Sequence, residues 1–338
     1  MNRRFASVMS TGAALGTRVV PNNELARNLD TSDEWIRSRT GIEARRFAGP
    51  GETASSLAAR AAARAFEAAR MDPAAVDLTI VATISGDQPL PSTASFVQDR
   101  LGIGGWAFDI GAACAGFVYA MEVGAAQIAA GSVDTVLVIG TEVLSRFLDF
   151  SDRTTCVLFG DGAGAAILRA AQEPGVVASV LETDGRSAGL LGIPAGGSSQ
   201  PASLDTVGRS DHTIHMRDGS EVFRRAVEAM SEAASSLLEK SGLTADDVAL
   251  LVPHQANARI IRSIAARLSF PDDRVFVDLA HVGNTSAASV PIALDKAWRS
   301  GRLQPGDVVL TAAFGAGLAW GANLIRWTAE RPVAEAAV

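Results

Sequence analysis

The chain has 338 residues, of which 48% are hydrophobic, and carries a formal net charge of −7. A chain of this size can bury a large core as one domain or as two fused halves, and its negative charge argues against nucleic acid as the main partner. Two cysteines and four histidines show no metal-ligand spacing and no disulfide framework. No apolar run approaches the roughly 20 residues that a membrane span needs.

The amino terminus begins Met1-Asn-Arg-Arg, and twin arginines can open an export signal. Ser7, Ser10 and Gly12 interrupt the apolar stretch that such a signal requires. We therefore expect a first strand and loop here, and a cytoplasmic protein.

The segment that starts at Thr31 reads Thr-Ser-Asp-Glu, which has the form of a capping box and predicts the start of a helix. This helix presents Trp35 and, one turn later, Arg39. By residue type alone, the pair is equally typical of a core tryptophan beside a solvated arginine.

The main organisational signal is an internal repeat with an offset of about 170 residues. In each half, a polar turn leads into an apolar run typical of a buried strand, ending at Ala82 and at His254. The segments that follow also correspond: predicted helices over 94–101 and 258–268, short strands over 105–110 and 274–279, a small-residue loop with a further helix, and apolar strands within 131–140 and 301–310.

Repeated strand–helix units predict an α/β fold in which two sheets face each other and helices form the other layers, in the order α-β-α-β-α. We expect the two halves to span residues 1–172 and 173–338. Cys114 and Asn284 are separated by one repeat offset, so their loops should meet across the pseudo-twofold axis. His254 ends a strand, where the active-site groups of α/β folds project.

Cys114 is the candidate nucleophile. Small residues flank it, and a helix over 115–130 is predicted to begin directly after it. The positive end of a helix dipole favours a thiolate, and small neighbours admit a bulky thioester. Cys156 lies within an apolar run and is interpreted as a core residue.

The glycine-rich segment Gly160-Asp-Gly-Ala-Gly could suggest a phosphate loop. It leads into a predicted strand over 165–169 and not into a helix, so the nucleotide-binding fingerprint fails. A tight turn near the active site is expected instead.

Motifs along nearly the whole chain resemble the β-ketoacyl-acyl-carrier-protein synthase III family, the initiating condensing enzymes of type II fatty acid synthesis. They are Thr31-Ser-Asp-Glu-Trp-Ile, Arg39-Thr-Gly-Ile, Ala112-Ala-Cys-Ala-Gly-Phe, Phe159-Gly-Asp-Gly-Ala-Gly-Ala, Val252-Pro-His-Gln-Ala-Asn, Gly283-Asn-Thr-Ser-Ala-Ala-Ser and Phe314-Gly-Ala-Gly-Leu-Ala-Trp-Gly. The resemblance implies the thiolase fold and a decarboxylative Claisen condensation of an acyl-CoA with malonyl-acyl carrier protein. It implies no cofactor beyond these thioester substrates.

The resemblance also implies the catalytic groups. Cys114, His254 and Asn284 match the family's Cys-His-Asn triad, whereas elongating ketosynthases have a second histidine. His254 Nε2 and the Asn284 amide would donate hydrogen bonds to the enolate that decarboxylation produces. The backbone N–H groups of Cys114 and Ala316 would form the oxyanion hole. The family more often has glycine at position 316, so alanine requires a negative φ there.

Substrate contacts follow from the same resemblance. The coenzyme A adenine would stack between Trp35 and Arg153, and its phosphates would meet Arg39. Further coenzyme A contacts are implied at Thr40, Phe223 and Asn257. Arg259 and Arg224 would dock the acidic carrier protein. Leu90, reaching in from the other subunit of a homodimer, would close the acyl pocket.

Two alternatives remain open at this point. The chain could transfer an acyl group from Cys114 to an oxygen, nitrogen or sulfur acceptor without forming a carbon–carbon bond. It could also be an inactive structural paralogue. An intact triad favours condensation, whereas the identity of the starter acyl group and the choice between fatty acid and polyketide synthesis are not determined by the sequence.

Overall fold

The computed structural model describes residues 4–330. The strands are β1 (Phe5–Leu15), β2 (Arg18–Pro21), β3 (Ala44–Phe47), β4 (Leu78–Ala82), β5 (Trp106–Ile110), β6 (Thr135–Glu142), β7 (Gly162–Ala171), β8 (Val176–Thr183), β9 (Leu191–Gly192), β10 (His215–Met216), β11 (Leu250–Pro253), β12 (Val308–Gly315) and β13 (Ala319–Arg326). The α-helices are α1 (Asn22–Leu25), α2 (Asp33–Thr40), α3 (Ala54–Ala69), α4 (Thr93–Leu101), α5 (Gly116–Ala129), α6 (Leu204–Gly208), α7 (Gly219–Ser241), α8 (Ala258–Arg267) and α9 (Ser289–Arg299). Among the 3-10 turns are η2 (Ala113–Ala115), η6 (Asp272–Arg274), η7 (Leu279–His281) and η8 (Ser286–Ala288).

Two mixed sheets carry the fold, and their strand orders correspond. The first sheet has the order β1-β7-β6-β4-β5, with β4 parallel to β5 and β6, and β7 antiparallel to β6 and β1. The second has the order β11-β12-β13-β8, with β11 parallel to β12, and β13 antiparallel to β12 and β8. The strands of the first sheet lie within residues 5–171 and those of the second within 176–326, as expected for a repeat.

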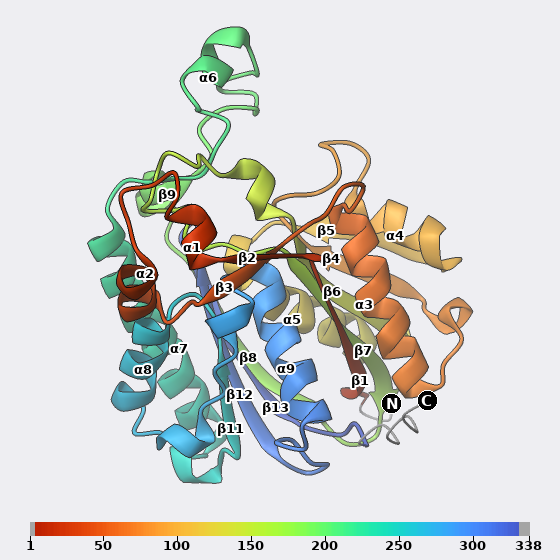
Figure 1. The fold of residues 1–338 in the computed structure, drawn as a ribbon. Helices are drawn as coiled ribbons and strands as arrows, with labels where there is room; N and C mark the ends of the chain where they lie inside the picture. Colours follow the sequence, from red (N-terminus) through yellow and green to blue (C-terminus); the bar gives the residue numbers. More distant parts are fainter. Residues whose placement is uncertain (1–3, 331–338) are drawn as a thin grey trace, which may run out of the picture.

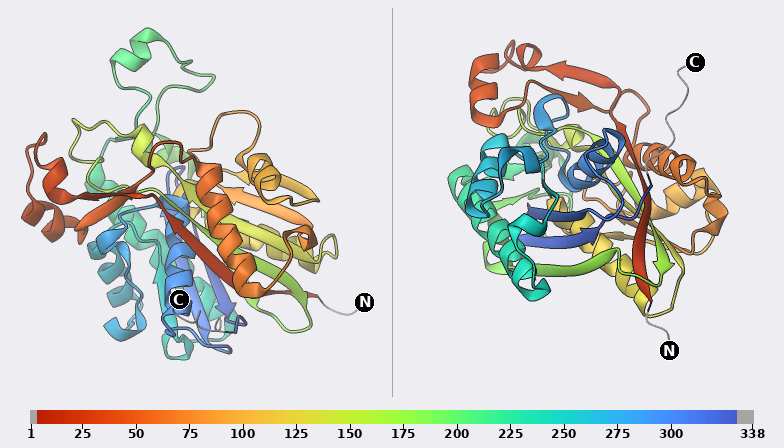
Figure 2. Two further views of the ribbon diagram at one scale, coloured as in Figure 1. Left: turned by 45° about the vertical axis from the view of Figure 1, so that its right-hand side comes forward. Right: turned by 90° about the horizontal axis from the view of Figure 1, so that it is seen from below.

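Helices complete a five-layer arrangement, which confirms the predicted fold class (Figures 1 and 2). α3 and α4 cover the outer face of the first sheet, and α7 packs on the outer face of the second with α8 beside it. α5 and α9 lie between the sheets. Their apolar side chains, including Phe117, Met121 and Trp298, are buried in one cluster with residues of both sheets. Among the described helices, none combines the length and apolar character needed to cross a bilayer.

The predicted strand over 274–279 is wrong. This segment forms a single bridge, between Leu251 and Val275, and then continues through turns. Its backbone is held by a side chain, because Gln255 Nε2 donates to Phe276 O and Gln255 Oε1 accepts from Asp278 N. Pro253, the last residue of β11, has no N–H to extend a ladder. The second sheet therefore lacks the fifth strand that β5 provides in the first.

Two excursions leave the layered core. The β2–β3 hairpin carries α2, whose N-cap is Ser32 and not Thr31: Ser32 Oγ accepts from Trp35 N at 3.0 Å. An arm between β9 and β10 carries α6 and stands away from the body of the molecule (Figure 1). Its exposed tip includes Leu204.

The close approach of α9 to the first sheet depends on Gly164 of β7. A Cβ atom placed on this glycine would lie 2.7 Å from the backbone nitrogen of Ile292 and from the Pro291 side chain. We predict that Gly164→Ala lowers the free energy of unfolding by about 1–3 kcal/mol, because the helix must move or the core must strain. Urea denaturation measures the loss. Gly104→Ala, where a Cβ meets nothing within 4 Å, is the matched control and should change stability by less than about 0.5 kcal/mol. Equal stability of the two variants would contradict the packing argument.

Candidate active site

Two equivalent turns meet between the sheets. η2 leads into α5 at Gly116 and η8 leads into α9 at Ser289, 173 residues later. Each turn begins with a non-glycine residue at positive φ, Ala113 at +44° and Ser286 at +49°, which is strained backbone of the kind concentrated at functional sites. At this offset the counterpart of Cys114 is Ala287. Asn284 therefore lies in the equivalent loop, three residues before the position that matches Cys114.

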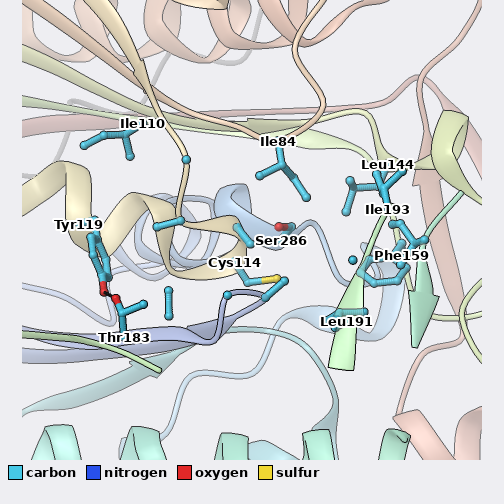
Figure 3. A pocket seen from close by; sticks show the side chains of 18 residues that line it. Ile84, Ile110, Cys114, Tyr119, Leu144, Phe159, Thr183, Leu191, Ile193 and Ser286 are labelled. Carbon is cyan, nitrogen blue, oxygen red and sulfur yellow. Dashed lines mark hydrogen bonds between the residues drawn. The ribbon is translucent and has the colours of Figure 1, made fainter. Parts of the chain in front are cut away.

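Cys114 lies at the wall of an apolar cavity of about 540 Å³. Its side chain extends between two groups of lining residues (Figure 3). Ile110, Tyr119 and Thr183 lie on one side, and Leu144, Phe159, Leu191 and Ile193 lie on the other. Only a glycine fits at position 315 of β12, because a Cβ there would come within 2.5 Å of the Cys114 amide nitrogen. The chain thus places a thiol where an acyl group can be enclosed.

The expectation of a lowered thiol pKa is wrong for the free protein. Burial raises the pKa of Cys114 to about 12, and the nearby Glu142 carboxylate adds to this increase. A hydrogen bond from the Ser286 hydroxyl opposes it. Desolvation is the largest of these contributions, because Cys114 is 9% exposed and the charged form loses its hydration. Burial therefore favours the neutral thiol at Cys114.

His254 is held as a neutral imidazole at the end of β11. Its Nδ1 lies 2.6 Å from Ser289 Oγ, and the same hydroxyl accepts from Gln255 N at 3.3 Å. When Ser289 donates its hydrogen to Nδ1, one of the two directions open to this pair, the ring proton lies on Nε2. Burial lowers the pKa of His254 to about 4. The ring is therefore neutral, and in this tautomer Nε2 is a hydrogen-bond donor.

Asn284 is oriented by its own loop. Its backbone bonds to Leu158 O and Gly160 N, both at 2.9 Å, which joins it to the segment around Phe159 in the cavity wall. Its Oδ1 accepts from Ser286 N at 2.8 Å. The amide nitrogen Nδ2 consequently points the other way, and among residues 4–330 it has no hydrogen-bond acceptor. Asn284 thus also presents a neutral N–H donor.

The end of β12 connects the segments that carry the predicted triad residues. His254 N bonds to Ala312 O of β12, and β12 ends at Gly315, against the Cys114 backbone. Ala316 follows and lines the cavity beside Cys114. It does not occur among the described non-glycine residues with positive φ, so its backbone tolerates alanine. Its N–H and that of Cys114 are the candidate oxyanion-hole donors.

Two guanidinium groups contact the ring of Trp35, which is half-buried. The Arg153 Cζ atom is 5.3 Å and the Arg39 Cζ atom 5.7 Å from the centre of the indole ring. Arg153 also bonds to the backbone and carboxylate of Asp30. Thr40 is different, because its hydroxyl is buried and engaged with Ile36 O and Ile42 N, where it stabilises the end of α2.

A second group of predicted residues adjoins α2. Asn257 caps α8 by accepting from Arg259 N, and its Nδ2 donates to Arg39 O. Arg259 is exposed, and its Cζ atom lies 5.7 Å from the centre of the Phe223 ring. Arg224 is exposed too, but it is paired with Glu221 and Glu228. Arg259 is thus the better placed of the two arginines to meet an acidic partner.

Comparison with known proteins identifies the family. Residues 108–185 match the description 3-oxoacyl-[acyl-carrier-protein] synthase III, and residues 238–327 match its C-terminal region. A β-ketoacyl-[acyl-carrier-protein] synthase III from Caldanaerobacter subterraneus is 47% identical over 96% of this chain and 98% of its own length. The chain belongs to the β-ketoacyl-[acyl-carrier-protein] synthase III family. It is therefore an acyl-transferring condensing enzyme.

Solved structures agree with this assignment. The 3-oxoacyl-[acyl-carrier-protein] synthase III from Aquifex aeolicus has a TM-score of 0.88 at 42% identity, with 95% of this chain and all of the other covered. The priming β-ketosynthase of the R1128 polyketide pathway has a TM-score of 0.90 at 38% identity, with 98% of both chains covered. The thiolase fold predicted from the sequence motifs is confirmed.

Three polar residues of this synthase III site were missed in the sequence. Ser286, Ser289 and Glu142 contact the triad positions or each other. Glu142 had a detectable signal, since it is an acidic residue at the carboxyl end of an apolar strand. The serines lie in the family motif but attract no attention by residue type. Within the described part of the chain, no group of three or more histidine, cysteine or acidic side chains is arranged to hold a metal ion.

The burial of His254 predicts that its imidazole resists protonation. We expect its imidazole to stay neutral across about pH 5 to 8, the range in which an unperturbed histidine takes up its proton. NMR of histidine-labelled protein measures this, with His254→Ala used to assign the resonance. A midpoint for His254 inside that range would show that the ring is not desolvated as described.

Proposed function

We propose that this chain joins an acyl group carried on Cys114 to a malonyl-acyl carrier protein, with loss of CO2, to form a β-ketoacyl-carrier protein. The observation that carries the proposal is a buried neutral imidazole, His254, together with the unpaired Asn284 Nδ2 donor, on segments that pack around a buried thiol. An enolate needs such donors, whereas transfer of an acyl group to an alcohol or amine does not require a second amide donor. Condensation is therefore favoured over simple acyl transfer.

The first half-reaction exchanges one thioester for another. The Cys114 sulfur attacks the acyl-CoA carbonyl, the bond from that carbonyl to the coenzyme A sulfur breaks, and the thiol proton is transferred to the departing coenzyme A sulfur. The tetrahedral oxyanion is stabilised by the N–H groups of Cys114 and Ala316. Because the resting thiol has a pKa of about 12, ionisation must accompany attack rather than precede it.

The second half-reaction builds the carbon–carbon bond. Malonyl thioester loses CO2, and its thioester oxygen takes up the negative charge as an enolate. His254 Nε2 and Asn284 Nδ2 donate hydrogen bonds to this oxygen. The enolate carbon attacks the acyl-Cys114 carbonyl, and collapse of the tetrahedral intermediate releases the β-ketoacyl product and the Cys114 thiolate, which recovers a proton.

Coenzyme A recognition is proposed at the surface cluster around Trp35. The adenine would enter between Trp35 and Arg153, which contact each other in the free protein, so Arg153 must move aside. Arg39 supplies a cation for the phosphates. Asn257 and Phe223 border the path inward, and Arg259 lies beside Phe223 for docking of the carrier protein.

A homodimer is proposed along β5. This strand is at the edge of the first sheet, and Trp106 at its start is 46% exposed. Unpaired edge strands pair readily with a second chain. Leu90 is 83% exposed and does not line the cavity of its own chain, as expected if it serves the partner's acyl pocket. Location in the cytoplasm remains a prediction from the sequence.

Reconstitution with labelled acyl-CoA and malonyl-carrier protein tests the proposal. The wild type should give a β-ketoacyl-carrier product, and Cys114→Ser should form neither acyl-enzyme nor product while folding normally. An acyl-enzyme that delivers its acyl group only to other acceptors would support the acyltransferase. No labelling of the wild type would support the inactive paralogue.

Asn284→Ala should separate the two half-reactions. We predict that acyl-Cys114 still forms, because the oxyanion donors of that step are backbone groups, whereas decarboxylation slows by about 10²–10³ with the loss of one enolate donor. Labelled CO2 release and acyl-enzyme formation are measured in parallel. Equal losses in both steps would refute the assigned role.

Arg259→Glu should weaken the carrier-protein step and leave acyl-CoA loading nearly intact. A charge reversal at an exposed rim acts mainly on the encounter rate, so the defect should shrink as salt is added. Arg267→Glu, also exposed on α8 but at its far end, is the matched control. If KM for the malonyl carrier does not change with Arg259→Glu, this residue does not dock it.

Leu90 should determine the depth of the acyl pocket. Acetyl-selective relatives often carry phenylalanine here, and one methylene in an apolar pocket changes discrimination by roughly 1–3 kcal/mol. We predict that the wild type accepts isobutyryl-CoA alongside acetyl-CoA and that Leu90→Phe rejects it. Competition kinetics with the two thioesters decide, and equal exclusion of isobutyryl-CoA by both proteins would show that Leu90 does not limit the pocket.

A further inference from the structure

A buried carboxylate lies behind the candidate nucleophile. Glu142, the last residue of β6, is fully buried. Its Oε2 accepts hydrogen bonds from Ser85 Oγ, from Ile84 N at 3.2 Å and from Thr83 Oγ1 at 3.3 Å. Its Oε1 is 3.2 Å from Ser286 Oγ. Hydroxyls and one amide therefore surround it.

No cation neutralises Glu142 within residues 4–330. The end of β4 contributes only the hydroxyls and the amide, η8 contributes Ser286, and η2 contributes the titratable thiol of Cys114. The next acidic groups are engaged elsewhere, Asp161 with Ser145 and Ala48, and Asp87 with Ser55. A carboxylate this deep can lose its charge only by taking up a proton.

Ser286 connects this carboxyl to the thiol. Its hydroxyl bonds to Glu142 Oε1, and Ser286 lies beside Cys114 in the wall of the same cavity (Figure 3), where its hydroxyl acts to lower the pKa of the thiol. The position of the hydroxyl is set by the strained turn, with φ at +49°, and by the bond from Ser286 N to Asn284 Oδ1. A hydroxyl has a single hydrogen, so it can donate to only one of its two neighbours at a time.

We propose that Glu142 is a positioning residue that acts through the Ser286 hydroxyl: protonated Glu142 lets Ser286 donate to the Cys114 sulfur, and ionised Glu142 takes that hydrogen and opposes the thiolate. The proposal rests on the role of Cys114 as nucleophile proposed above. It assigns to Ser286 two functions, since its backbone orients Asn284 and its side chain prepares Cys114.

The two states differ only in where hydrogens point and in one proton. With the proton on Oε1, Glu142 donates to Ser286 Oγ, and Ser286 donates to sulfur, which stabilises developing negative charge. Without it, Ser286 donates to Oε1, and the carboxylate repels a thiolate. Burial raises the pKa of Glu142 to about 7, so both states are populated near neutral pH.

Alkylation of Cys114 by iodoacetamide tests the inference without any substrate. Peptide mass spectrometry separates Cys114 from Cys156, and the rate is followed across the Glu142 pKa of about 7. Glu142→Gln keeps the shape of the side chain, can donate to Ser286 and has no charge. It should react at the wild-type rate well below that pKa and about tenfold faster well above it, for a change of one unit in thiol pKa.

Ser286→Ala should change the alkylation rate below the pKa of Glu142, whereas Glu142→Gln changes it above that pKa. It removes the donor but keeps the N–H that orients Asn284, so alkylation should slow below the Glu142 pKa and change little above it. Thr83→Val is the matched control, because it removes a hydroxyl from Glu142 without changing charge or the link to sulfur. Its alkylation profile should keep the wild-type amplitude, with the midpoint moved to higher pH because Glu142 loses a bond that lowers its pKa.

Two results would overturn the proposal. If Glu142→Gln and the wild type have the same profile, the carboxyl does not influence the thiol. If Glu142→Gln changes the rate by one factor at every pH, its role is structural. Failure of the proposed nucleophile is a separate observation, because Cys114→Ser would then still form a covalent acyl-enzyme in the labelling assay, whatever the alkylation profile shows.

Discussion

The site depends on backbone approaching backbone where two helices begin between two sheets. A side chain on Gly140 of β6 would overlap the carbonyl of Ala287, and one on Gly315 of β12 would come within 2.5 Å of the Cys114 nitrogen. The absence of these side chains brings η2, η8 and the end of β12 into direct contact. Close approach of this kind is a main structural use of glycine. This close contact of backbone segments fixes where the triad positions lie.

The same close packing removes water, and its electrostatic result is a neutral centre. Burial moves the pKa values of Cys114 and His254 in opposite directions, to about 12 and about 4, and each shift favours the uncharged group. Neutral N–H donors suit an enolate, which brings its own charge when the substrate decarboxylates. Negative charge therefore enters the site only with the substrate, and donors that are already in place stabilise it without having to move.

Hydrogen bonds from residues just after the triad positions orient the triad. Ser289 bonds to Nδ1 of His254 and so orients its ring, and the N–H of Ser286 orients the amide of Asn284. Both serines belong to the loop and helix start that also carry Asn284. Hydrogen-bond partners such as these serines determine which atom of a functional side chain faces the substrate. Serine is a common residue, so its type alone does not mark these positions in the sequence as functional.

The sequence by itself determined the architecture and the family, and it predicts the triad positions, because a repeat of strands and helices and several ordered motifs are properties of linear order. Tertiary structure alone decided the protonation of those residues: the dipole argument for Cys114 is local, whereas desolvation depends on all the elements packed around it. It also decided that 274–279 is no strand, because Pro253 ends the ladder and Gln255 takes its place. Burial and side-chain competition arise between segments far apart in the chain, so they cannot be inferred from local pattern.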